Sequence, residues 1–336
     1  MSSSSVLDTG QDGVYPREAV LDLLREYGRS PLSFLVRYDA PWQAFLAPEG
    51  AVCYLLARGA AVVWSDPLCA PADTEVLLRR FTRAMRDARR GICLVAVDEL
   101  TANAALACGY SALKVGEEPW FELATWRPPA GNRGKNLRWC VNHARRERVV
   151  VAEANRHDPG LDRELRDLLS KWEAVVGRPV TRSVLRPSPL DEVEEKRIFV
   201  AYRDGRLEAF AACSPIYARG GWYLEDVFRA PGAVNGASEL LVVETLAGLR
   251  KSGARSAALG IAPFRGSGEQ LDRRARWIGR TLTFAFRYLD RRYGFASLAG
   301  YESKFEPSAW TPRYVAFSPP WPGPRVVRAA VRFLDA

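Results

Sequence analysis

The sequence predicts an α/β protein made of two similar halves, each with a mixed central sheet flanked by helices. The first observation is that helical periodicity alternates with short apolar runs along most of the 336 residues. The second is that both halves carry the same order: a helix, a meander of short strands, a second helix and a further strand. The third is a stretch rich in Pro, Gly and Arg at 127–135, which separates the halves.

The first half has three segments with helical periodicity, at 16–28, 74–90 and 99–107. The earliest begins with Pro16, a residue favoured in the first helical turn, and the next ends near Gly91. Short apolar runs bounded by turn residues predict strands within 41–71, 92–97 and 110–123. We expect the 41–71 segment to form three strands, and the 110–123 segment to form strands around a Gly-Glu-Glu turn.

The second half repeats this pattern. Its helical segments are 135–148, 159–177, 237–253 and 268–293. Its strands are expected at 149–154, 197–229 and 256–263, with a closing strand in YESKFEPSAWTPRYVAF, 301–317. Asp-Gly and Gly-Gly turns divide the 197–229 segment into three strands. Prolines at the boundary of the closing strand favour a place at the edge of the sheet.

A strand meander that runs into a helix and a further strand is the element order of the GNAT acyltransferase fold. We therefore expect a tandem GNAT-like α/β fold. The predicted divisions are a disordered tail at 1–15, an N-terminal GNAT-like domain at 16–130, a C-terminal GNAT-like catalytic domain at 131–318 and a basic tail at 319–336.

Composition excludes several kinds of protein. The six cysteines include no C-x-x-C pair, which favours free thiols in a cytosolic protein over a disulfide framework or zinc site. With only two histidines, a histidine-rich metal site or a Ser-His-Asp triad is not expected, and no metal is predicted. No apolar run is long enough to cross a membrane, and the N-terminus lacks the features of a signal peptide.

The formal net charge of +9 favours polyanionic partners, although the arginine excess also fits a GC-rich genome. Two basic clusters are candidate surfaces for the phosphates of a nucleic acid: Arg133, Lys135, Arg138, Arg145 and Arg146 in one, and Arg273, Arg276 and Arg280 in the other. Trp126 and Trp139 lie near the first cluster and offer stacking surfaces for single-stranded nucleic acid. A solvated helix face remains the alternative for each cluster. The basic C-terminal tail fits either an anionic membrane or docking onto the protein.

The expected place for a coenzyme A pyrophosphate lacks the usual glycine-rich turn. FRAPGAVNGASELL, 228–241, has no tight R-x-x-G-x-G spacing. It also places Glu239 in the first turn of a helix, where it would repel a pyrophosphate. This favours a cationic group, such as the ammonium of an amino acid, although a first-turn glutamate also simply favours the helix dipole.

The C-terminal stretch YGFASLAGYESKFEPSAWTPRYVAF resembles the closing motif of the catalytic domain of the lysyl-phosphatidylglycerol synthases, the multiple peptide resistance factor family. Further segments align in order: SDPLCAP, KVGEEPWFEL, KNLRWCVNHARRER, YLEDVFRAPGAVNGASELL and LGIAPF. The resemblance therefore covers most of the chain. The sequence lacks the transmembrane flippase region of that family, has FASLAG at 295–300 where F-Q-G-L-R is expected, and has Glu302 in place of a lysine. It is similar to a soluble, stand-alone relative.

The resemblance implies transfer of an aminoacyl group from aminoacyl-tRNA to an acceptor hydroxyl or amine, with no cofactor. It also makes the two basic clusters described above candidate tRNA-binding surfaces. The acceptor stays open between a phosphatidylglycerol-like lipid and a small molecule such as a natural-product intermediate. We expect a cytoplasmic enzyme, with peripheral contact at the inner membrane face as an open alternative. An acyl-CoA-dependent N-acetyltransferase and a non-catalytic tRNA- or membrane-binding module are the competing interpretations.

Because the ester of aminoacyl-tRNA is already activated, correct positioning of donor and acceptor is sufficient and no covalent intermediate is required. Carboxylates are expected to hold the ammonium of the amino acid, and Asp226, Glu239 and Glu118 are the candidates. Asp226 or Glu302 is the expected general base.

A cation is expected to stabilise the developing oxyanion or the 3′ phosphate of the tRNA, and Lys304 and Arg313 are the candidates. The expected catalytic residues are therefore Asp226, Glu302 and Lys304. Tyr301, Phe305 and Tyr314 are candidate contacts for the terminal adenosine. The structural alternative is that Lys304 and Arg313 only pair with neighbouring glutamates.

Overall fold

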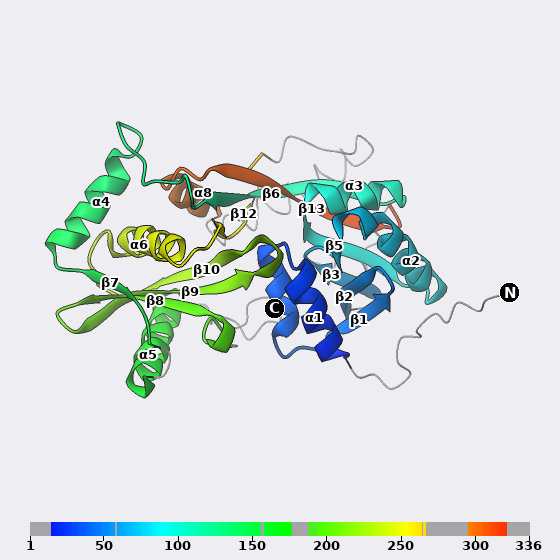
Figure 1. The fold of residues 1–336 in the computed structure, drawn as a ribbon, viewed down its shortest axis with the longest axis horizontal. Helices are drawn as coiled ribbons and strands as arrows, with labels where there is room; N and C mark the ends of the chain where they lie inside the picture. Colours follow the sequence, from blue (N-terminus) through cyan, green and yellow to red (C-terminus); the bar gives the residue numbers. More distant parts are fainter. Residues whose placement is uncertain are drawn as a thin grey trace. The chain divides into compact units, whose positions relative to one another are not determined.

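The computed structural model describes residues 15–57, 59–155, 158–176, 188–191, 193–263, 265–266 and 295–320 (Figure 1). These residues form two compact units. Unit 1 takes its described residues from Met1–Glu117, Pro263–Gly294 and Thr311–Ala336, and unit 2 from Glu118–Ala262 and Phe295–Trp310. The predicted domains are each one continuous stretch, whereas each unit also contains a segment from the C-terminal part of the chain.

Unit 1 is a sheet with helices packed on it. Its helices are α1 (Arg17–Tyr27), η1 (Pro31–Arg37), η2 (Pro71–Asp73), α2 (Thr74–Asp87) and α3 (Glu99–Ala107). Its strands are β1 (Gln43–Ala47), β2 (Gly50–Ala57), β3 (Ala60–Trp64), β4 (Leu68–Cys69) and β5 (Gly91–Val97), with parts of β6 (Ser111–Glu122) and β13 (Ala309–Ser318). The strand order is β1-β2-β3-β5-β13-β6. The β3–β5 pair is parallel, and β13 is antiparallel to β5.

The core of unit 1 follows from the apolar stripe of α2. Leu77, Leu78, Phe81 and Met85 recur at helical spacing and are buried against β2, β3 and β5. The next helix, α3, begins where the Asp98 side chain accepts a hydrogen bond from the Thr101 amide at 2.8 Å. Such a cap satisfies one of the free amides at the helix start and fixes the position of Asp98.

Unit 2 has helices on both faces of its strands. Its helices are α4 (Lys135–Arg146), α5 (Pro159–Val176), η3 (Val193–Glu195), η4 (Tyr217–Arg219), α6 (Ala237–Lys251) and α8 (Phe295–Ser303). Its strands are the end of β6, β7 (Val150–Glu153), β8 (Arg197–Arg203), β9 (Arg206–Ile216), β10 (Gly221–Arg229) and β11 (Ser256–Ala258); β12 (Ala262–Pro263) pairs with β6. The order is β6-β11-β10-β9-β8-β7. Among the described strands of unit 2, β10 and β11 run parallel. The pairs β11–β6, β10–β9, β9–β8 and β8–β7 are antiparallel.

Alternating residues of the unit 2 strands face two separate cores. Phe199 and Ala211 pack with α6, whereas Ile198 and Phe210 pack with α5. Because successive side chains of a strand point to opposite faces, α5 and α6 cover opposite faces of the β8–β10 meander. Figure 1 shows this arrangement, with α6 in yellow on one side of these strands and α5 in green on the other.

Most of the predicted elements are confirmed, and four predictions are wrong. The 41–71 segment forms four strands rather than three, because Leu68–Cys69 pairs with β2 as β4. The predicted closing strand at 301–317 begins in α8, which ends at Ser303, and the strand itself starts at Ala309. β6 runs without a break through the predicted Gly-Glu-Glu turn, and Gly116 is buried within it. The closing strand is not an edge, because β13 lies between β5 and β6 in the strand order. The predicted helix at 268–293, with Arg273, Arg276 and Arg280, lies outside the described residues, as does nearly all of both predicted tails. No helix within the described part of the chain has the length and apolar character to span a membrane.

Candidate functional site

The start of α6 is the first part of the candidate site in unit 2. Gly236 precedes the helix with a φ of 89°, a conformation that glycine adopts without strain. A Cβ at this position would lie 2.1 Å from the carbonyl oxygen of Cys140 on α4. The glycine therefore lets α4 approach the N-terminus of α6 closely, where Glu239 lies in the first turn.

Lys304 forms an ion pair with Glu239. Its Nζ donates to Glu239 Oε1 at 3.0 Å, although the two residues are 65 positions apart. The Glu239 side chain is 11% exposed and that of Lys304 is 31% exposed, so solvent or a ligand reaches the ammonium more readily than the carboxylate. Lys304 therefore pairs with neither of the nearby glutamates that the sequence offered as alternatives.

Tyr301 lies beside this pair. The Lys304 ammonium is 5.2 Å from the centre of the Tyr301 ring. The Tyr301 hydroxyl is buried and has no hydrogen-bond partner among the described residues. Burial, followed by the negative charge of Glu239, raises the pKa of this phenol well above its ordinary value. The hydroxyl is therefore a neutral donor placed next to an ion pair.

Phe305 anchors the segment that carries Lys304. Its side chain is fully buried in the core of unit 2, and its ring lies edge-on to Tyr301 at 5.2 Å. The indole nitrogen of Trp126 donates to the Phe305 carbonyl at 3.0 Å. These contacts hold the residues on both sides of Lys304 in place.

Negative charge gathers around Tyr223 on β10. The register of β10 against β9 shifts between Leu224 and Asp226, which marks a bulge at Glu225. Burial raises the pKa of the Tyr223 phenol well above its ordinary value, with further contributions from the carboxylates of Asp226, Glu225, Glu118 and Glu302, in that order. A region of this charge favours a cationic ligand.

The carboxylates around Tyr223 differ in exposure. Glu118 and Glu302 are 1% and 2% exposed, whereas Asp226 is on the surface. Glu118 accepts a hydrogen bond from the indole of Trp120 at 2.9 Å. Lys196, which is fully buried, donates to Glu225 Oε2 at 3.0 Å and to the Pro189 carbonyl at 3.1 Å. Lys196 thus fixes the bulged residue next to Asp226.

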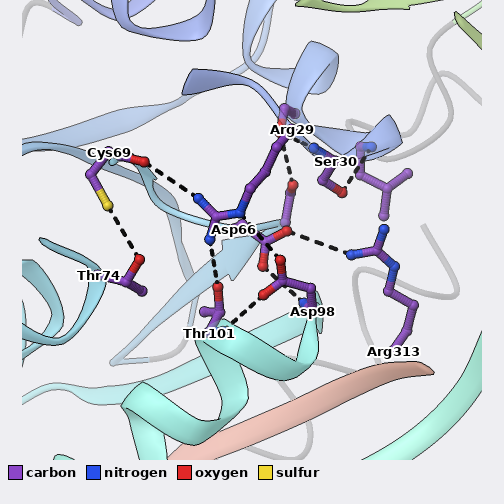
Figure 2. A network of polar contacts seen from close by, with 11 residues as sticks. Arg29, Ser30, Asp66, Cys69, Thr74, Asp98, Thr101 and Arg313 are labelled. Carbon is purple, nitrogen blue, oxygen red and sulfur yellow. Dashed lines mark hydrogen bonds and ion pairs between the residues drawn. The ribbon is translucent and has the colours of Figure 1, made fainter. Parts of the chain in front are cut away.

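Unit 1 contains a separate network of charged side chains, of which Asp66 and Arg313 are buried and Arg29 and Asp98 partly buried (Figure 2). Arg313 Nη1 lies 3.5 Å from Asp66 Oδ2, and both side chains are at most 2% exposed. Asp66 Oδ1 accepts a hydrogen bond from the Asp98 amide at 2.9 Å. Arg29 Nε donates to Asp98 Oδ2 at 3.2 Å, and Arg29 Nη2 donates to Thr101 Oγ1 at 3.1 Å. Two acidic and two basic side chains therefore form one chain of contacts.

The two carboxyl groups of this network differ in pKa. Burial and then the neighbouring Asp98 charge raise the pKa of Asp66 to about 6. Burial also acts on Asp98, but the Arg29 guanidinium and the hydrogen bonds from Thr101 outweigh it and lower that pKa below its ordinary value. Asp98 is therefore the permanent anion, and Asp66 is the group that titrates.

The first predicted tRNA-binding cluster lies on α4 and the loop before it. Arg138 donates to the carbonyls of Pro129 and Gly131, at 3.0 and 2.7 Å, and so holds that loop. Arg145 pairs with Glu244 at 2.6 Å. The other members of the cluster are exposed: Arg133, Lys135 and Arg146.

The predicted site residues fall into both units. Unit 2 contains Asp226, Glu302, Lys304, Glu239, Glu118, Tyr301 and Phe305. Unit 1 contains Arg313 and Tyr314, and Tyr314 is buried in the core opposite Val97. The sequence reasoning missed Tyr223, Lys196 and the Asp66 network. A signal for the first was available in YLED, where consecutive acidic residues interrupt an otherwise apolar strand.

Comparison with known proteins gives consistent results. The family described as "Phosphatidylglycerol lysyltransferase, C-terminal" matches residues 22–317. The lysylphosphatidylglycerol biosynthesis bifunctional protein LysX of Mycobacterium avium is 23% identical over 96% of this chain. The chain spans only 27% of that protein's length.

Two solved structures share the fold. The C-terminal domain of a putative lysylphosphatidylglycerol synthetase from Agrobacterium fabrum is 23% identical, with a TM-score of 0.76 and 95% of each chain covered. L-PGS from Bacillus licheniformis is 20% identical, with a TM-score of 0.77 over 97% of this chain and 99% of that one. The predicted α/β, tandem GNAT-like fold is confirmed. Because the family match extends over most of its length, the chain belongs to the phosphatidylglycerol lysyltransferase C-terminal family.

Proposed function

We propose that this protein is an aminoacyltransferase that moves an amino acid from charged tRNA to the hydroxyl of a phosphatidylglycerol-like lipid. An amine or hydroxyl of a small molecule is the second class of acceptor. The observation that carries the proposal is the Glu239–Lys304 ion pair at the start of α6, in a chain whose family members are lysyltransferases by name. LysX, a relative of this chain, is named for lysylphosphatidylglycerol biosynthesis.

The site is better suited to a cationic cargo than to coenzyme A. At the N-terminus of α6, the Glu239 carboxylate lies in the first turn and neutralises Lys304, which leaves little net positive charge to hold a pyrophosphate. The carboxylates around Tyr223 instead favour an ammonium group. We assign Glu118 and Glu302 to binding of the cationic amino acid, because both are buried and act on the same phenol.

In the proposed reaction, the acceptor oxygen attacks the carbonyl carbon of the aminoacyl ester. A new C–O bond forms, and the bond from the carbonyl carbon to the ribose oxygen of the tRNA breaks. The proton of the acceptor hydroxyl passes to a carboxylate, for which exposed Asp226 is the first candidate, and then to the leaving ribose oxygen. Lys304 stabilises the negative charge on the carbonyl oxygen in the tetrahedral intermediate, and Glu239 holds its ammonium in place.

The test is transfer of a radiolabelled amino acid from a mixture of charged tRNAs. Reactions contain the full chain and vesicles of phosphatidylglycerol, and a parallel set contains a small-molecule extract. We expect label in an organic-soluble product that does not form when the tRNA is first digested with RNase. Mass spectrometry then names the amino acid and the acceptor.

The opposite result is also defined. No transfer from the complete mixture of charged tRNAs to lipid or extract contradicts the proposal. A rise in melting temperature with acetyl-CoA, but not with charged tRNA, supports an acyl-CoA-dependent enzyme instead.

A further inference from the structure

Strand β9 carries a buried carboxylate that the proposed reaction does not use. The register of β9 against β8 passes from Leu207 to Ala209 between two consecutive residues of β8, so Glu208 is the extra residue of a β-bulge. A bulge turns its side chain out of the regular alternation of the strand. Glu208 is only 1% exposed, and a carboxylate buried without partners would be strongly destabilising. Its contacts therefore matter.

Both oxygens of the Glu208 carboxylate have partners. Oε2 accepts a hydrogen bond from the backbone amide of Val234 at 2.7 Å. Oε1 accepts one from Arg203 Nε at 3.2 Å, and this arginine lies nearer to the solvent. A hydrogen bond from an amide to a charged oxygen is stronger than one between neutral groups. Glu208 therefore holds the segment around Val234 firmly, while Arg203 neutralises its charge.

The contact with Val234 places Glu208 beside the loop that joins β10 to α6. The amide of Ala230, at the start of this loop, donates to the Glu208 carbonyl at 2.8 Å. One residue thus binds the loop twice, through its backbone and through its side chain. The loop also contains Gly232 and Gly236 with positive φ angles of 76° and 89°. Because glycine has wide conformational freedom, contacts from outside the loop are needed to restrict its path.

This loop leads directly into the turn of α6 that faces Lys304. The amide of Ala237, the first residue of α6, donates to the Val234 carbonyl at 3.1 Å. Glu239 follows two residues later in the first turn, and its carboxylate accepts the hydrogen bond from Lys304. The contact between Glu208 and Val234 therefore restricts where α6 begins and, through it, where the Glu239–Lys304 ion pair lies.

We propose that Glu208 is a positioning residue for the transfer reaction, which acts by fixing the loop before α6 and hence the ammonium of Lys304. The inference rests on the proposed function, in which Lys304 stabilises the tetrahedral intermediate. Catalytic groups must be held within a fraction of an ångström of their productive geometry, and buried hydrogen bonds behind them supply that precision. Glu208 itself touches neither substrate.

Two substitutions separate the length of this side chain from its charge. Glu208→Asp keeps a carboxylate beside Arg203 but is one methylene shorter, so it withdraws the acceptor from the Val234 amide. Glu208→Gln keeps the length and an oxygen acceptor, and loses the charge. We expect Glu208→Asp to lower kcat about tenfold with an unchanged KM for charged tRNA. We expect Glu208→Gln to stay within about threefold of the wild-type kcat. The reverse order overturns the proposal, because the charge rather than the contact would then matter.

A double-mutant cycle tests the route through Lys304. In the Lys304→Ala background, Glu208→Asp is expected to change the single-turnover rate by less than about twofold, because the group that it positions is gone. An equal loss in both backgrounds overturns the proposal. The control for stability is Leu165→Ala, in the core beneath α5, which lowers the melting temperature and leaves kcat unchanged. If Leu165→Ala loses as much kcat as Glu208→Asp, reduced stability explains both and the proposal fails.

Hydrogen exchange tests the inference without any activity. Glu208→Asp is expected to speed exchange of the Val234 and Leu240 amides about tenfold, whereas Glu208→Gln leaves them protected. A wild-type protein that transfers no label contradicts the proposed function, and the exchange rates then decide the inference alone. Equal exchange in all three proteins overturns it. A wild-type protein that transfers label, with a Glu208→Asp variant of equal kcat, overturns the inference only.

Discussion

The buried network of unit 1 and the Tyr223 region of unit 2 both contain several ionised groups, but their charges are arranged differently. In unit 1, Asp66 faces Arg313 and Asp98 faces Arg29, so that each acidic group has an arginine within 3.5 Å. In unit 2, the carboxylates of Asp226, Glu225, Glu118 and Glu302 act together on the phenol of Tyr223, and Glu118 accepts a hydrogen bond from the indole of Trp120.

This difference is consistent with the proposed function, in which unit 2 binds the ligand and the network of unit 1 is structural. A buried network with balanced charge stabilises the conformation of the chain that supplies it, and removal of one member leaves an uncompensated charge. A group of carboxylates around one phenol, with Asp226 on the surface, suits the cationic ligand of the proposed function. We therefore expect Arg313 to stabilise the fold of unit 1, although the sequence predicted a substrate-binding role for it. We expect Lys304 to act in the proposed reaction.

The largest expected effect is that of Arg313→Leu. It leaves Asp66 buried without its guanidinium, and we expect the free energy of unfolding of unit 1 to fall by about 3–5 kcal/mol at neutral pH. Hydrogen exchange of the β5 amides reports unit 1, and exchange of the β9 amides reports unit 2. The control is Arg83→Leu on the surface of α2, which is expected to change stability by less than about 0.5 kcal/mol. An Arg313→Leu variant that is as stable as wild type but fails to transfer label would show that Arg313 acts in the reaction and not in stability.

Lys304→Ala tests whether the ion pair in unit 2 acts in the reaction. Loss of a cation at the developing oxyanion is expected to lower kcat by about 100- to 1000-fold, with little change in melting temperature because the side chain is partly exposed. Lys251→Ala, an exposed lysine at the end of α6, is the matched control with full activity. If Lys304→Ala transfers label at the wild-type rate but unfolds more easily, its ion pair with Glu239 is structural.

Asp66→Asn sharpens the comparison through pH. The folded pKa of Asp66, about 6, is higher than the ordinary value of 3.8, so the folded state prefers the protonated group. Its contribution to stability is therefore greatest below pH 3.8 and is lost as the pH rises to 6, by up to about 3 kcal/mol. Asp98, with its lowered pKa, titrates below this window.

The neutral Asn side chain removes this dependence. We expect the difference in unfolding free energy between wild type and Asp66→Asn, measured with urea, to change between pH 4 and pH 6.5 and to be constant above that. A pH-independent difference would show that Asp66 does not titrate in the folded state.

Trp126→Phe has the smallest expected effect. It removes the hydrogen bond to the Phe305 carbonyl, and we expect a loss of about 1–2 kcal/mol in the stability of unit 2. Because this contact holds the segment next to Lys304, kcat is expected to fall a few-fold while the KM for tRNA is unchanged. An unaltered kcat in a destabilised variant would show that the position of Lys304 does not depend on Trp126.

The sequence predicted the elements well where local pattern decides them. The apolar stripe of α2 and the Pro16 start of α1 are local signals, and both helices form as expected. The Gly-Glu-Glu turn failed because pairing within the sheet overrides the weak strand propensity of these residues, and Gly116 is buried in β6. The place of β13 depends on pairing with a strand far away in the chain, which no local pattern reveals.

The site was only partly accessible from sequence for the same reason. Glu239 and Lys304 were both selected as candidates, but their ion pair depends on how α6 and the end of α8 pack. Tyr223 was missed because its chemistry comes from carboxylates on three separate segments, such as Glu118 and Glu302. Asp66 and Asp98 come from different turns, and only the folded chain brings them to Arg313 and Arg29.

The interior place of β13 in unit 1 has a consequence for protein synthesis. β5 ends at Val97, whereas its neighbour β13 begins at Ala309, so the ribosome must add about 200 residues before the sheet of unit 1 receives this strand. At ordinary rates of translation this takes tens of seconds, during which one side of β5 lacks its final partner. A nascent chain is therefore exposed to aggregation or chaperone binding at β5 until β13 has been synthesised.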